Sequence, residues 1–170
     1  ITPIPNLAIS TNDADKLSAA NTEYPGVKVW IKSNTQTLDT VHTANLIAEI
    51  KGSVHPEKVI LIGAHMDSWF NTPGAHDDGA GCAQMIDVIR IFKDLNLKPQ
   101  NTIRLVLFMD EEMLQSGSKV YAEFAGKEQK QHIACFESDA GGLLPLGFEI
   151  DASDAAIKAI QHQSAKLADY

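Results

Sequence analysis

The stretch at 59–81 constrains the fold more than any other part of the chain. Four consecutive aliphatic residues at 59–62 lead into the sequence GAHMDSW at 63–69, and the Gly- and Asp-rich sequence PGAHDDGAG follows at 73–81. A continuous apolar run of this kind is typical of a strand that is covered on both faces of a sheet. We therefore predict a central strand that ends in polar residues and leads through a loop into a helix.

Strands and helices are predicted to alternate along most of the chain. Apolar or alternating runs predict strands at 27–32, 46–50, 59–64, 103–109 and 133–136. Capping residues and helical spacing predict helices at 10–20, 79–95, 116–129 and 153–168. A turn at 55–58 is predicted to join the strands on either side of it in a hairpin. The fold class is therefore α/β, with a mixed, largely parallel central sheet and helices on both faces.

The composition limits the classes of function. With 170 residues the chain has room for one domain of ordinary size, and its apolar content is 44%. The net charge is -8, from 14 basic and 22 acidic residues, and Lys and Arg do not cluster. We therefore expect binding neither to nucleic acid nor to an anionic membrane. No apolar run approaches the roughly 20 residues that span a bilayer.

The chain contains only two cysteines, which excludes a disulfide scaffold. Cys82 lies in a predicted helix and Cys135 in a predicted strand, so we expect both to be buried free thiols. A disulfide or a metal ligand is the alternative.

The predicted central strand ends in a histidine and an aspartate. His65 and Asp67 are two residues apart, which places both side chains on one face of an extended strand. A metal-bound histidine usually donates its other ring N–H to a carboxylate, a role that Asp67 can fill. Taken alone, however, the pair is better explained by a buried histidine with a neighbouring carboxylate.

Acidic residues follow the other predicted strands and precede the next helix. Asp77 and Asp78 come before a predicted helix, but capping of that helix explains only one of them. Glu111 and Glu112 follow the most apolar strand, where one can bind a metal while the other acts as a general base. Asp139 ends a further strand, and ligands of such sheets collect at strand ends. The set that suits zinc or a similar divalent ion consists of His65, Asp77, Glu112 and Asp139.

These sequences resemble the M28 family of dinuclear zinc exopeptidases. The matching stretches are GAHMDSW at 63–69, PGAHDDGAG at 73–81, IRLVLF with EE at 103–112, and ESDAGG at 137–142. The resemblance extends from about residue 45 to residue 152, and the motifs are specific in combination. Within the family the chain looks most like the carboxypeptidase Q group, because Trp69 follows Asp-Ser and the sequence ESDAG surrounds Asp139.

The resemblance implies a set of metal ligands. One ion would be bound by His65, Asp77 and Asp139. The second would be bound by Asp77, as a bridging ligand, and by Glu112. The implied cofactor is therefore a pair of zinc ions in the complete protein.

The resemblance also implies a reaction. Glu111 corresponds to the general base and Asp67 to the acid that orients His65, so both are expected to be catalytic. The expected reaction is hydrolysis of terminal peptide bonds of peptides or dipeptides by a water held at the metal ions. The peptide bond before Asp78 is expected to be cis.

The chain departs from the family in one respect. The family has a further histidine ligand downstream of Asp139, and no such motif occurs here before Tyr170. We therefore expect a fragment, in which residues 1–33 return from an inserted protease-associated domain and residues 34–170 form a peptidase domain that lacks its C-terminal part. Such a fragment should hold at most one zinc ion tightly. The remaining histidines match no ligand position and are expected at the surface: His42, His55, His76, His132 and His162.

Other functions compete with this interpretation. A glutaminyl-cyclase-like acyltransferase would use the same fold with a single zinc ion, and a non-catalytic, peptidase-like fragment or binding module would use it without chemistry. The resemblance implies a secreted or periplasmic location. The choice between the amino and the carboxyl terminus of the substrate, and the oligomeric state, are left open.

Overall fold

The computed structural model describes residues 7–139, 141–143 and 147–164. The chain forms two compact units, residues 1–41 and residues 42–170, and each is described by itself. No helix in the described part of the chain has the length and apolar content required to cross a bilayer.

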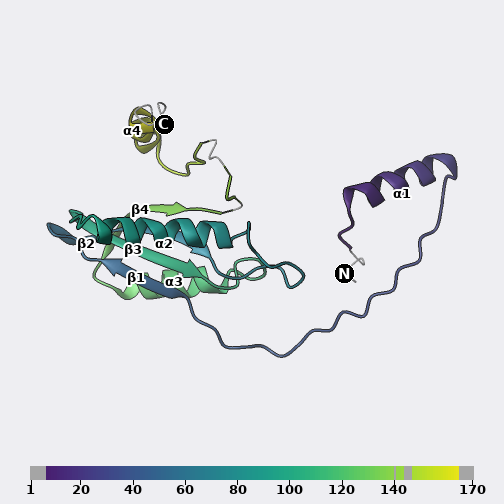
Figure 1. The fold of residues 1–170 in the computed structure, drawn as a ribbon, viewed down its shortest axis with the longest axis horizontal. Helices are drawn as coiled ribbons and strands as arrows, with labels where there is room; N and C mark the ends of the chain where they lie inside the picture. The colour runs from purple at the N-terminus through teal and green to yellow at the C-terminus, as the bar shows by residue number, and fades with distance from the viewer. Residues whose placement is uncertain (1–6, 140, 144–146, 165–170) are drawn as a thin grey trace. The chain divides into compact units, whose positions relative to one another are not determined.

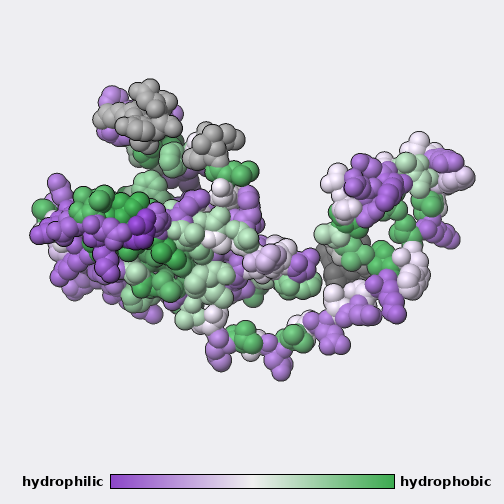
Figure 2. All heavy atoms as spheres, in the orientation of Figure 1, coloured by the Kyte–Doolittle hydropathy of each residue, from purple (hydrophilic) through white to green (hydrophobic). Residues whose placement is uncertain are grey.

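In its described residues, 7–41, the first unit contains one helix, α1, at Thr11–Glu23 (Figure 1). The Ser10 hydroxyl accepts the N–H of Asp13 and donates to the Asp13 carboxylate, so Ser10 caps the helix that was predicted at 10–20. The strand predicted at 27–32 was wrong, because this stretch has no strand hydrogen bonds. Alternation does not suffice without a neighbouring strand to pair the backbone groups. Apolar side chains of this unit are exposed instead (Figure 2), and Trp30 is 83% exposed.

The second unit is built on a four-stranded sheet with the order β1-β3-β2-β4. The strands are β1 at Leu46–Ile50, β2 at His55–His65, β3 at Asn101–Phe108 and β4 at Gln131–Glu137. β2 pairs in parallel with both β3 and β4, whereas β1 is antiparallel to β3. The predicted mixed, largely parallel sheet with β2 at its centre is therefore confirmed.

The predicted hairpin between the first two strands was wrong. Residues 55–58 belong to β2 itself, and β3 lies between β1 and β2. The turn at 52–54 packs against the start of β3 instead, where the N–H of Ser53 donates to the Pro99 carbonyl. The connection through a helix places parallel β3 beside β2, so the strand that follows β1 in sequence is not its neighbour in space.

Helices cover both faces of the sheet (Figure 1). One face of β2 and β3 packs against α2 at Gly79–Asp94, whereas the other packs against α3 at Ser116–Lys127. The α2 side buries Ile62, Ala64, Ile103, Leu105 and Leu107, and the α3 side buries Leu61, Val106 and Tyr121. A last helix, α4, spans Asp154–Ser164. Alternation along β2 and β3 thus supplies two apolar layers.

A charged residue is buried on the α3 face. Arg104 of β3 is 2% exposed, and its guanidinium donates to Glu49 at 2.6 Å, to Glu128 at 2.6 and 3.0 Å, and to the hydroxyl of Tyr121 at 3.0 Å. The Tyr121 hydroxyl lies 2.7 Å from Nε2 of His132. His132 is therefore hydrogen-bonded and half-buried, contrary to the expectation that it lies free at the surface.

The pKa values of the two glutamates reflect this network. Burial raises the pKa of Glu49, but hydrogen bonds from Lys130 and Arg104 outweigh it, so the net shift is downward. The hydrogen bonds from Arg104 lower the pKa of Glu128. Each carboxylate is thus stabilised in its charged form by folding.

Replacing the buried cation should destabilise the fold. We expect Arg104→Met to lower the free energy of unfolding by about 3 kcal/mol, since both glutamates lose their partner but keep some contact with solvent. The pKa values of Glu49 and Glu128 are lower in the folded protein than the value of 4.5 for the unfolded chain. Their ionisation therefore stabilises the fold at pH values above 4.5. The difference between wild type and variant should therefore be full above that pH and shrink below it, as measured by urea denaturation.

A matched control is available on the surface of α2. Arg90 also pairs with two carboxylates, those of Asp87 and Asp94, but its side chain is 58% exposed. Arg90→Met should change the free energy of unfolding much less than Arg104→Met does, because solvent screens the exposed ion pairs of Arg90. Equal losses in the two variants would contradict a special role for Arg104.

Candidate metal centre

His65 ends β2 and is 1% exposed. Its Nδ1 lies 3.0 Å from the main-chain carbonyl of Asp67, which can only accept a hydrogen bond. In the neutral ring Nδ1 therefore carries the proton and Nε2 the lone pair, whereas in the protonated ring Nε2 donates to Asp77 Oδ1 at 3.0 Å. The N–H of His65 and the thiol of Cys82 further fix this strand end, because the first donates to Asp78 and the second to the His65 carbonyl.

Three carboxylates face Nε2 of His65. The distances from Nε2 are 3.0 Å to Asp77 Oδ1, 3.4 Å to Asp139 Oδ1 and 3.9 Å to Glu111 Oε2. A lone pair surrounded by carboxylate oxygens is unfavourable without a proton or a metal cation between them. Burial lowers the pKa of His65, but the Asp67 carbonyl and the nearby carboxylates raise it, and the net shift is upward.

The donor set fits a divalent metal ion. In the part of the chain that the structure describes, one group of His, Cys, Asp and Glu side chains has ligand atoms that all lie within 4.8 Å of one another: His65, Asp77 and Asp139. One imidazole nitrogen and carboxylate oxygens are ligands that zinc accepts. Three of the four predicted ligands are therefore brought together from β2, the loop before α2 and the end of β4.

The fourth predicted ligand, Glu112, carries an orphaned oxygen. Its Oε1 is buried and has no hydrogen-bond partner among the described residues. Removal from water raises the pKa of Glu112, and the charges of Asp77 and Glu111 raise it further. A buried carboxylate oxygen without a partner costs free energy unless a cation binds it. The arrangement at Glu112 therefore also fits a metal ligand.

Asp67 contacts His65, as the sequence predicted, and also the main chain of Glu111 and Glu112. The His65 ring is held by the main-chain carbonyl of Asp67, whereas the Asp67 carboxylate is 3.7 Å from Nδ1. That carboxylate accepts the N–H of Glu111 at 3.0 Å and the N–H of Glu112 at 3.2 Å. Asp67 thus links the end of β2 to the acidic pair that follows β3.

Asp78 is the second of the paired aspartates and serves as the cap of α2. It is 1% exposed; its Oδ1 accepts the N–H of Gly81 and its Oδ2 accepts the N–H of His65, each at 3.0 Å. Burial raises the pKa of Asp78, and the two N–H groups oppose that shift without cancelling it. A Cβ at Gly81 would lie 2.3 Å from Oδ1, so only glycine fits here. The peptide bond between Asp77 and Asp78 is cis, as expected.

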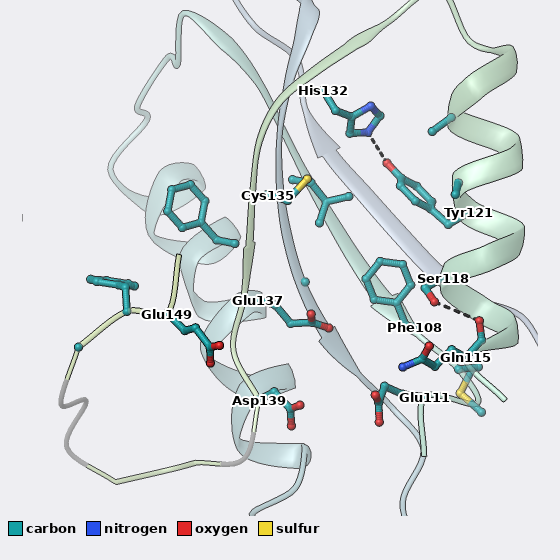
Figure 3. Close-up of a pocket in the computed structure, with 18 residues that line it drawn as sticks. Phe108, Glu111, Gln115, Ser118, Tyr121, His132, Cys135, Glu137, Asp139 and Glu149 are labelled. Atoms are coloured by element: carbon teal, nitrogen blue, oxygen red, sulfur yellow. Dashed lines mark hydrogen bonds between the residues drawn. The ribbon is translucent and has the colours of Figure 1, made fainter. Parts of the chain in front are cut away.

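A cavity of about 1030 Å³ opens beside these carboxylates (Figure 3). Glu111 and Asp139 lie at one end with Glu137, and the Tyr121–His132 pair lies at the other. Burial raises the pKa of Glu137, and Asp139 and Glu111 raise it further. Glu137 was not predicted as a site residue. In the sequence it is marked only by its position at the end of β4, two residues before Asp139.

The cysteines do not take part in this site as ligands. Both are free, and Cys82 is half-buried whereas Cys135 is exposed. The expectation of a buried thiol was therefore wrong for Cys135. β4 pairs with β2 alone among the described strands, so it is less covered than a central strand.

Comparisons with known proteins identify relatives of this chain. A model of peptidase family M28 matches residues 45–170. Carboxypeptidase Q of Rattus norvegicus is 34% identical over 164 residues, which are 96% of this chain and 34% of that protein. Carboxypeptidase Q of Homo sapiens is also 34% identical over 164 residues, with the same coverage. Aminopeptidase Y of Saccharomyces cerevisiae is 31% identical over 76% of this chain and 24% of that protein.

A solved structure is also similar. The crystal structure of a peptidase M28 precursor from Shewanella amazonensis SB2B is 45% identical, with a TM-score of 0.54, over 57% of this chain and 22% of that chain. This chain spans about a third of the length of the carboxypeptidase Q proteins it matches. The match to the family model, at residues 45–170, covers the strands and loops that carry the residues described above.

Substitution of Asp78 should be costly even when the shape is kept. Asparagine has a single acceptor oxygen, so Asp78→Asn would turn its NH2 group toward one of two backbone N–H groups. We expect a loss of about 1–3 kcal/mol in the free energy of unfolding, measured by urea denaturation. Asp87→Asn on α2, where the side chain is 49% exposed, is the control, and an equal effect there would contradict the role given to Asp78.

Proposed function

The chain belongs to peptidase family M28, and we propose that the protein is a zinc-dependent exopeptidase that hydrolyses terminal peptide bonds. Homology to carboxypeptidase Q and to aminopeptidases supports this proposal. The observation that carries it is the position of His65 Nε2, which faces Asp77, Asp139 and Glu111 at the carboxyl ends of parallel strands. The substrates would be peptides or dipeptides.

His65, Asp77 and Asp139 would hold one zinc ion in the proposed site. Glu112 would hold a second ion together with Asp77, in agreement with the orphaned oxygen of Glu112. Zinc, when bound, supplies a Lewis acid that lowers the pKa of water and polarises the scissile carbonyl. We further propose that this chain holds one ion tightly, through the first three residues, because their ligand atoms are already close together.

Glu111 is the proposed general base. Its side chain is 32% exposed and borders both the His65 ring and the cavity, so water and substrate can reach it. Glu111 would accept a proton from the attacking water as the new C–O bond forms. The same carboxyl group would return that proton to the amine nitrogen as the C–N bond breaks.

Asp67 and Asp78 act by holding other groups in this proposal. The Asp67 carbonyl keeps the proton of His65 on Nδ1, which leaves Nε2 available as a ligand. Asp78 is 1% exposed and holds the His65 main chain. A secreted or periplasmic location is proposed from the family resemblance alone.

Removing the base while keeping the shape should separate metal binding from turnover. In the complete protein we expect Glu111→Gln to lower kcat by at least about 100-fold, because general-base catalysis contributes that much or more, while the zinc content stays the same. Hydrolysis of dipeptides and elemental analysis are the measurements. Glu123→Gln, on the exposed side of α3, should leave both unchanged, and full activity of Glu111→Gln would remove Glu111 from the mechanism.

Zinc content tests the metal sites directly. Chelation should abolish dipeptide hydrolysis by the complete protein, and added Zn²⁺ should restore it. The 170-residue chain should bind one Zn²⁺ tightly in a calorimetric titration, and His65→Ala should lose this binding because it removes the nitrogen ligand. Two tightly bound ions in this chain would overturn the proposal of a single tight site, and a single ion in the complete protein would favour a one-zinc acyltransferase.

A further inference from the structure

The two glutamates of the proposed site lie in a loop that is closed at its base. The loop runs from Met109, after β3, to Gly117, in the first turn of α3. The N–H of Gly117 donates to the Met109 carbonyl at 3.0 Å, and the N–H of Gln115 donates to the Asp110 carbonyl at 2.6 Å. The ends of the loop are therefore held together by backbone hydrogen bonds.

A side chain from another strand strengthens this closure. Asn45, which directly precedes β1, accepts the N–H of Met109 through Oδ1 at 3.1 Å and donates from Nδ2 to the Gly117 carbonyl at 2.8 Å. The antiparallel register places Leu46 opposite Leu107, so the amide of Asn45 lies beside the end of β3. One planar amide thus joins the first residue of the loop to its last residue, Gly117, in the first turn of α3.

The packing at this point leaves no room for a side chain at Gly117. A Cβ at Gly117 would lie 2.3 Å from the Met109 carbonyl oxygen and 2.5 Å from Oδ1 of Asn45. Asn45 is half-buried, so both of its hydrogen bonds are partly shielded from water and neither would be replaced without cost.

The loop is held at its other side by Asp67. The Asp67 carboxylate accepts the N–H groups of Glu111 and Glu112, whereas Asn45 binds only the residues at the base. The two contacts come from different strands and reach the loop independently. Their joint effect is to fix the backbone from which both glutamate side chains start.

We propose that Asn45 is a positioning residue for Glu111 and Glu112. It holds the base of their loop, so that one carboxylate meets the second metal ion and the other meets the attacking water. This inference rests on the proposed function, because those two roles belong to it. Asn45 touches neither metal nor substrate and acts through the main chain of Met109 and Gly117.

The chemistry of the amide explains why asparagine is required. Aspartate has the same shape and accepts the Met109 N–H, but it cannot donate to the Gly117 carbonyl and would place a charge beside that oxygen. Alanine loses both hydrogen bonds. The two variants should therefore affect the loop to different degrees while the fold of the sheet is kept.

The test compares Asn45→Ala and Asn45→Asp with Thr102→Val in the complete protein. Thr102 is 1% exposed at the opposite end of β3, and its hydroxyl joins the Gly52 N–H to the Pro56 carbonyl. Thr102→Val thus also removes a buried bridge between two backbone groups, far along the strand from the glutamates. The readouts are thermal unfolding, Zn²⁺ titration, and kcat and KM for dipeptides.

Asn45→Ala should weaken the zinc site of Glu112 by about 10-fold or more, lower kcat by a similar factor and leave KM nearly unchanged. The site of His65, Asp77 and Asp139 should keep its affinity. Asn45→Asp should show losses in the same direction, which also decides the question if the alanine variant does not fold. Thr102→Val should lose thermal stability without changing zinc affinity or kcat.

Two results would overturn the proposal. One is unchanged zinc affinity and kcat in both folded Asn45 variants, and the other is an equal loss in Thr102→Val. Failure of the proposed function would be a separate result. If the wild-type protein does not hydrolyse peptides, its zinc affinity can still be compared with that of the variants. In that case, selective weakening of the Glu112 site by the Asn45 substitutions would retain the positioning role.

Discussion

The two hydrogen bonds of the Asp78 carboxylate hold together the parts of this structure that matter most. One carboxylate oxygen binds the N–H of His65 at the end of β2, and the other binds the N–H of Gly81 at the start of α2. Strand end, loop and helix start are thereby fixed to one another through a single side chain. His65 donates its N–H to Asp78, and Asp77 directly precedes Asp78 in the chain. The distance between His65 and Asp77 is therefore set by the main chain.

The site concentrates like charges at one end of an apolar sheet. Asp77, Glu111 and Asp139 all lie within 3.9 Å of His65 Nε2, and the layers beneath them are formed by aliphatic side chains of β2 and β3. Repulsion between these carboxylates opposes folding, and burial of apolar surface together with the Arg104 network offsets it. The geometry of the site is thus maintained by residues that take no part in its chemistry.

Much of this arrangement was predictable because it follows from local patterns. The apolar run of β2 predicted a central strand, and the pair Asp77 and Asp78 before a predicted helix indicated that one of the two caps it. Pairing between distant strands was not predictable in the same way, since the pattern of β1 fits either neighbour. The stretch at 27–32 has the alternation of a strand, but among the described residues it has none to pair with.

The candidate site, too, was predictable where it follows from local patterns and unpredictable where it depends on tertiary contacts. The residue types and their positions at strand ends indicated His65, Asp77 and Asp139, because carboxyl ends of parallel strands meet at one edge. The contact of the Asp67 carboxylate with two N–H groups, and the bridge formed by Asn45, depend on tertiary distances that no spacing in the sequence encodes. His132 was misjudged for this reason as well, because its partner Tyr121 comes from a helix.

The order of the strands has a consequence for how this family can vary. β2 lies between β3 and β4, so His65 occupies the middle position, with the acidic pair after β3 on one side and Asp139 after β4 on the other. Neighbouring strands are about 4.8 Å apart in any sheet. The separation of the ligand backbones is therefore a property of the sheet's hydrogen bonding. Core side chains can be exchanged for others of similar volume during evolution while the spacing between the ligands is conserved.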